Sequence, residues 1–97
     1  MTIEKNRQGA NFELKLIGWL DTEASLSLAE EIDALDESVT SLVLNCQELE
    51  YISSAGLRQL VAAYKKMNGA MTLKHVSGEI LGIINMTGLG KKLHIEA

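Results

Sequence analysis

One stretch of the sequence constrains the fold most. It is a short apolar run, followed by two adjacent serines and then by an amphipathic helix. The run covers residues 42–44, and its continuous hydrophobicity suits a strand that is buried on both faces. After Ser53 and Ser54, apolar residues recur at helical spacing and predict a helix from about residue 55 to 67. Its apolar face comprises Leu57, Leu60, Val61 and Tyr64. A buried strand joined to such a helix is typical of an α/β domain.

The two serines belong to the stretch 51–57, here called the serine turn. They stand where a helix begins, so that unpaired N–H groups and the positive end of the helix dipole would stabilise a capping hydroxyl or a phosphate. From the spacing alone an N-cap worth roughly 1 kcal/mol is favoured, because serine is common at this position. A modification site is the second interpretation.

The rest of the chain alternates strand and helix patterns. The predicted strands cover residues 2–7, 12–16 (ended by Gly18), 41–46, 71–75 and 92–95. The predicted helices cover residues 22–35, 55–67 and a short segment between a Ser77 cap and Gly88. The resulting order β-β-α-β-α-β-α-β predicts a mixed sheet of about five strands with helices mainly on one face, in a single domain spanning residues 1–97.

Composition narrows the classes of function. The net charge of −4 argues against direct binding of nucleic acid, which requires a basic surface. No apolar run is long enough to insert into a membrane, and the start does not resemble a signal peptide, so we expect a cytoplasmic protein. The lone Cys46 suits a packing role. With one cysteine and two separated histidines, His75 and His94, we expect no metal site and no cofactor.

Three segments together resemble the STAS family, which includes the anti-sigma factor antagonists. Residues 42–57 resemble its apolar strand followed by Asp-Ser-Ser/Thr-Gly-Leu, with Ser53 in place of the aspartate. Residues 18–21 resemble its Gly-x-Leu-Asp, and residues 86–89 its Met-Ser/Thr-Gly-Leu. The three segments span almost the whole chain in the family's order. The chain departs from the family after the last strand, where only Glu96 and Ala97 remain and the usual final helix is absent.

The resemblance implies a function as an anti-sigma factor antagonist. The unphosphorylated form would bind and sequester an anti-sigma factor that is also a serine kinase, and so release a sigma factor. Counting back from Gly56 and Leu57 puts the phosphoacceptor at Ser54, with Ser53 as the second candidate. Phosphorylation would switch binding off, and a phosphatase would restore it.

The resemblance also outlines a surface for the partner. Its predicted members are Trp19, Asp21, Ser53, Ala55, Gly56, Leu57 and Arg58. Asp21 matches an aspartate that the family brings close to the serine turn, and a simple N-cap is an equally good interpretation. For Trp19 we favour packing in the core over an exposed interface anchor. We further expect Tyr51 to pack under the turn and His75 to be a core or edge histidine on its strand.

Other classes of function compete with this one. An enzyme with a nucleophilic serine is disfavoured, because the chain has no Gly-x-Ser-x-Gly elbow and no evident base for the serine. STAS-like domains also act as non-catalytic scaffolds of signalling assemblies or as accessory subunits of membrane transport systems. A third alternative is the same switch acting on a target other than a sigma factor.

Overall fold

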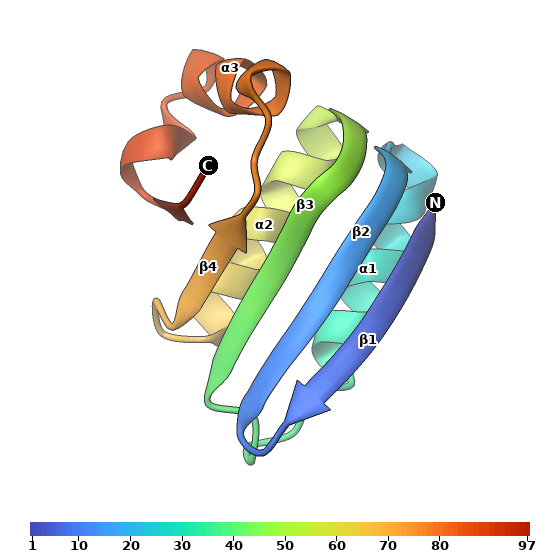
Figure 1. The fold of residues 1–97 in the computed structure, drawn as a ribbon, viewed down its shortest axis with the longest axis vertical. Coiled ribbons are helices and arrows are strands. Elements are labelled where there is room, and N and C mark those ends of the chain that lie inside the picture. Colours follow the sequence, from blue (N-terminus) through green and yellow to red (C-terminus); the bar gives the residue numbers. More distant parts are fainter.

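The computed structural model describes residues 1–97 and has five strands and three α-helices (Figure 1). The strands are β1 (Thr2–Gln8), β2 (Asn11–Leu20), β3 (Ser41–Ile52), β4 (Met71–Lys74) and β5 (His94–Ile95). The helices are α1 (Thr22–Asp33), α2 (Ser54–Lys66) and α3 (Gly78–Met86), with a short 3-10 helix η1 (Leu89–Lys91) before β5. The predicted α/β class and the predicted order of elements are therefore confirmed.

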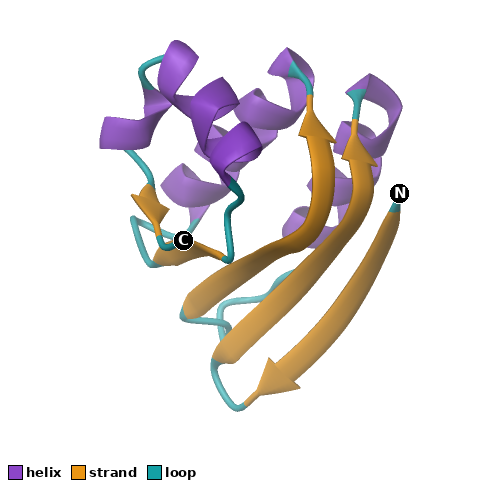
Figure 2. Cartoon of the chain, turned by 45° about the horizontal axis from the view of Figure 1, so that its top comes forward, coloured by secondary structure: helices purple, strands orange, loops and turns teal.

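The sheet is mixed and has the order β1-β2-β3-β4-β5. β1 is antiparallel to β2, whereas all the other neighbouring strands are parallel. Figure 1 shows α1 and α2 behind the sheet, whose near face carries no helix. Because β2 and β3 are parallel, they end at the same edge, where the chain turns back into α1 and α2 (Figure 2). The loops that follow these two strands are thus neighbours.

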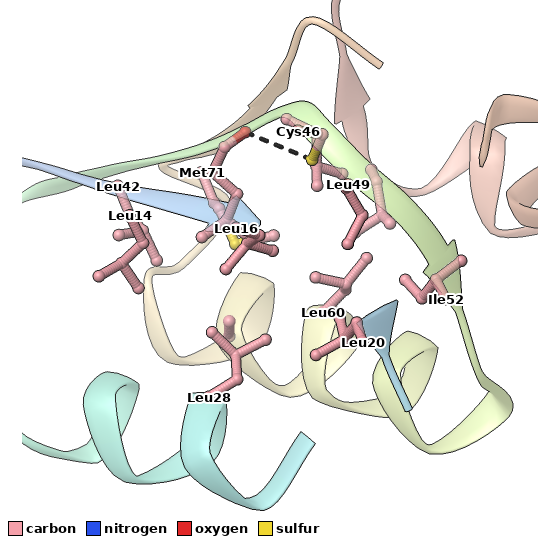
Figure 3. Close-up of a cluster of buried hydrophobic side chains, with 14 of the residues drawn as sticks. Leu14, Leu16, Leu20, Leu28, Leu42, Cys46, Leu49, Ile52, Leu60 and Met71 are labelled. Atoms are coloured by element: carbon pink, nitrogen blue, oxygen red, sulfur yellow. Dashed lines mark hydrogen bonds between the residues drawn. The ribbon is translucent and has the colours of Figure 1, made fainter. Parts of the chain in front are cut away.

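One hydrophobic core fills the space between the sheet and the helices. In the first parts of β2 and β3 every second residue points into it, as Leu14, Leu16, Leu42 and Leu44 show by their complete or almost complete burial. Leu28 of α1 and Leu60 of α2 close the core from the helix side (Figure 3). The cluster contains 22 buried residues drawn from both layers. Its burial is the main favourable contribution to folding.

Two strands are longer than the sequence pattern predicts. β2 runs past Gly18 to Leu20, and β3 runs past Cys46 to Ile52. The pairing of the two strands shifts between Lys15 and Ile17 and again after Gly18, which adopts a φ of 102° within its strand. Such bulges insert extra residues and break the two-residue alternation. The prediction that these strands end earlier is therefore wrong.

The end of β4 also corrects a prediction. His75 is neither a core residue nor part of the strand, because β4 ends at Lys74 and the His75 side chain is exposed. Its backbone takes a left-handed conformation, with φ of 57°, which turns the chain toward the Ser77 cap of α3. Glu96 and Ala97, which follow β5, are not helical.

Candidate functional site

The serine turn is attached to the sheet by the backbone of Ser53. Its N–H donates to the carbonyl of Leu20, the last residue of β2, at 2.8 Å. Its hydroxyl accepts a hydrogen bond from the Gly56 N–H at 3.1 Å, so that Ser53 is the N-cap of α2. The hydroxyl of Ser53 thereby has a structural role, because it satisfies one of the unpaired N–H groups of the first turn.

Ser54 is the first residue of α2 and is exposed to solvent. Its hydroxyl has no hydrogen-bond partner within the chain, in contrast to that of Ser53. The positive end of the helix dipole lies at the same point, where it favours a negative charge. Ser54 is therefore accessible to a second protein, and its position is electrostatically suited to a phosphate.

Gly56 packs tightly against the end of β2. A Cβ added at this position would lie 2.8 Å from the Leu20 Cγ and 2.9 Å from the Leu20 carbonyl oxygen. Both distances are shorter than real contacts allow. The following residue, Leu57, is buried in the core. The absence of a side chain at Gly56 thus lets α2 begin directly on the end of β2.

Asp21 lies in the neighbouring loop and caps α1. Its Oδ1 accepts a hydrogen bond from the Ala24 N–H at 2.8 Å. It makes no hydrogen bond to Ser53 or Ser54, so the capping interpretation is the one that the structure shows. The bond between Leu20 and Ser53 keeps the Asp21 loop beside the serine turn. A contact between Asp21 and a partner stays a prediction.

A mainly apolar hollow of about 420 Å³ adjoins Ser54. It is lined by Ser54, Leu57, Arg58, Val61, Thr87 and Leu89. Arg58 is exposed and forms no ion pair in the chain. Thr87 and Leu89 were missing from the predicted site, although their segment, residues 86–89, carried the third part of the family resemblance. All three segments of that resemblance therefore meet around the serine turn.

Trp19 and Tyr51 form an exposed aromatic pair at the ends of β2 and β3. The two residues are directly opposite in the sheet, and their ring centroids lie 5.7 Å apart with the planes tilted by 50°. Trp19 is 59% exposed and Tyr51 is 43% exposed. The predictions that Trp19 is packed and that Tyr51 lies under the turn are thus wrong. Both side chains point to the sheet face that no helix covers.

Three groups outside the serine turn have shifted pKa values. Burial raises the pKa of the Cys46 thiol to about 12, which makes this cysteine an inert core residue. A hydrogen bond and the charge of Glu48 raise the pKa of Lys15. Hydrogen bonds from Ser38 lower the pKa of Asp36. No group of three or more His, Cys, Asp or Glu side chains could hold a metal ion.

Comparison with known proteins agrees with this arrangement. The family model described as the STAS domain matches residues 2–97, so the chain belongs to the STAS family. It is similar to the anti-sigma-B factor antagonist of Bacillus subtilis (strain 168), with 22% identity over 100 residues, which cover all of this chain and 92% of that protein. No helix of the chain is both long and apolar enough to cross a membrane.

Solved structures share the fold at low sequence identity. The unphosphorylated form of the anti-sigma factor antagonist SpoIIAA superposes with a TM-score of 0.83 at 17% identity, covering 99% of this chain and 89% of that one. Its phosphorylated form, from Bacillus, gives 0.76 at 17% identity and covers 99% and 92%. A sulfate transporter family protein from Wolinella succinogenes gives 0.78 at 17% identity and covers 90% and 76%. The fold therefore occurs both in antagonists and in a transporter family.

Proposed function

We propose that this protein is an anti-sigma factor antagonist. Its unmodified form binds and sequesters an anti-sigma factor that is also a serine kinase, and so frees a sigma factor. The observation that carries the proposal is the Ser54 hydroxyl, which is exposed and unpaired at the start of α2 beside an apolar hollow. The similarity to the Bacillus subtilis antagonist and to both forms of SpoIIAA supports it.

Phosphorylation of Ser54 acts in this proposal as a charge switch. It adds about −1.5 to −2 charges at neutral pH. In the complex that charge would have to leave water, which is costly unless the partner supplies a matching cation. A penalty of about 3 kcal/mol weakens binding roughly a hundredfold. In the free protein the N-terminus of α2 stabilises the phosphate, and a phosphatase resets the switch.

Ser54 is a better phosphoacceptor than Ser53. The Ser53 hydroxyl is only partly exposed and caps α2 through Gly56, so its modification would require the loss of that cap. Ser54 carries no such constraint. The partner would contact the surface around it, with Ala55 and Arg58 on α2 and Asp21 on the neighbouring loop as further members. Gly56 and Leu57, which were predicted to belong to this surface, are buried and support it from below.

The test is to incubate the protein with ATP, Mg²⁺ and lysate of its source, and to locate added phosphate by mass spectrometry. Wild type and the Ser53→Ala variant should gain one phosphate, and the Ser54→Ala variant none. Ser53→Ala serves as the matched control, because it changes the adjacent hydroxyl. Loss of phosphate only in Ser53→Ala would move the switch to Ser53. A wild type that stays unmodified, while a known antagonist is modified by its own kinase, would contradict the proposal.

A second candidate is a non-catalytic scaffold or an accessory domain of a membrane transport system. The similarity to the Wolinella succinogenes protein favours it. In that case the serine turn would be only a helix cap. Recovery of the protein with membranes or in a large assembly would support this alternative, whereas co-purification with a kinase-like ATPase would support the antagonist.

A further inference from the structure

The Trp19–Tyr51 pair is exposed to solvent. The chain has one tryptophan and two tyrosines, and two of these three aromatic residues face each other on adjacent strands. Each is followed by a residue that is buried in the core, Leu20 at 0% and Ile52 at 2% exposure. Because successive side chains of a strand point to opposite faces, burial of these neighbours directs both rings outward. Exposed aromatic residues held in this way are typical of interaction sites.

Two acidic residues of β3 precede the pair, and Glu50 is the extra residue of the strand between Leu49, which pairs with Gly18, and Tyr51, which pairs with Trp19. Glu48 and Glu50 line a hollow of about 310 Å³ together with Gln47, Ile17 and Gly18. This hollow directly precedes the two rings along β2 and β3. Glu50 is exposed and forms no ion pair in the chain. Glu48 is bound to Lys15 at 2.6 Å, and its side chain is still 53% exposed.

We propose that Trp19 and Tyr51, together with Glu50, bind a cationic side chain, arginine or lysine, of a protein partner. The aromatic faces attract a cation through their quadrupoles, and the Glu50 carboxylate supplies the opposite charge. Arginine fits best, because its planar guanidinium stacks on an aromatic ring while its N–H groups pair with a carboxylate. A purely apolar partner would bury the Glu50 charge without compensation. An acidic partner would be repelled by Glu50, whose charge is not paired within the chain.

This site lies apart from the hollow beside Ser54, and it does not depend on whether Ser54 is modified. The two share no lining residue. They occur at the same edge of the sheet, because Tyr51 precedes the Ser53 cap by two residues and Trp19 adjoins Leu20, which binds Ser53. A partner that covers the serine turn can therefore reach the aromatic pair with a basic side chain.

The single indole makes the site directly observable. We would titrate the ¹⁵N-labelled protein with tri-arginine amide and follow the indole N–H resonance of Trp19 by NMR. A separate titration with tri-glutamate, a peptide of opposite charge, is the control. The arginine peptide should shift this resonance saturably, and tri-glutamate should not. Glu50→Gln and Tyr51→Leu should each raise the dissociation constant about fivefold, as the loss of one favourable contact would. Tyr51→Phe keeps the ring and should bind like wild type.

Glu37→Gln is the matched control, because it removes an exposed acidic charge at the opposite end of the sheet, beside the loop before β3. It should leave the titration unchanged. Equal weakening by Glu37→Gln and Glu50→Gln would reduce the effect to general charge attraction and overturn the proposal. An indole resonance that does not shift would also overturn the proposal. A resonance that shifts with protein concentration alone would overturn it too, because the pair would then belong to a contact between two copies of the protein. The amide spectrum of each variant verifies that it is folded.

Discussion

Gly56 illustrates how one missing side chain positions the serine turn. Gly56→Ala should lower the free energy of unfolding by about 1 to 3 kcal/mol, because the new methyl group would press against Leu20. Gly82→Ala is the control, since Gly82 lies in α3 with no atom near an added Cβ. It should stabilise the protein by about 1 kcal/mol through helix propensity. Urea denaturation measures both. Equal effects of the two substitutions would contradict the close contact.

Cys46 offers a second test at the residue scale. Its thiol is buried, donates to the Leu44 carbonyl at 3.6 Å (Figure 3) and has a pKa raised to about 12. The reactive thiolate is therefore nearly absent in the folded protein at pH 8. Iodoacetamide should label the native protein at least about a hundredfold more slowly than the protein unfolded in urea. Mass spectrometry measures both labelling rates. Similar rates for the native and the unfolded protein would show that β3 opens readily around Cys46.

At the scale of elements, the two adjacent serines should differ in their contribution to α2. Ser53→Ala removes the cap and should cost about 1 kcal/mol of unfolding free energy. Ser54→Ala removes a hydroxyl without a partner and should change stability by less than about 0.5 kcal/mol. Chemical denaturation of the two variants and wild type gives the comparison. A larger loss for Ser54→Ala would mean that Ser54 is the cap.

The elements also show what the sequence could and could not predict. Helix caps and apolar stripes placed α1, α2 and α3 correctly to within a few residues, because these signals are local. The ends of β2 and β3 escaped prediction, since bulges break the alternation on which strand assignment depends. Trp19 and Tyr51 lie on the unpredicted extensions of these strands, next to the buried Leu20 and Ile52, so their exposure was not predicted either. Thr87 and Leu89 join the site only through tertiary packing, and the family resemblance of their segment was the only available signal.

At the scale of the whole molecule, we expect phosphorylation to leave the fold unchanged. Ser54 is already exposed, so a phosphate needs no rearrangement of the core. In amide NMR spectra of the phosphorylated and unmodified protein, shifts should be confined to residues near 53–58 and 86–89. Core residues such as Leu14 and Leu44 should keep their resonances. Broad changes across β2 and β3 would show instead that the mark alters the sheet.

The hydrogen bond between Ser53 and Leu20 and the close contact at Gly56 fasten the start of α2 to the sheet at two points. A phosphate on Ser54 would then be attached to a helix start that is held in place by the sheet. The phosphorylated and unphosphorylated molecules would have the same fold. A partner would then distinguish them by the charge and bulk at residue 54, which act over no more than about 10 Å. The response would therefore depend on how many molecules are unphosphorylated. The ratio of their number to the number of partner molecules would set its size.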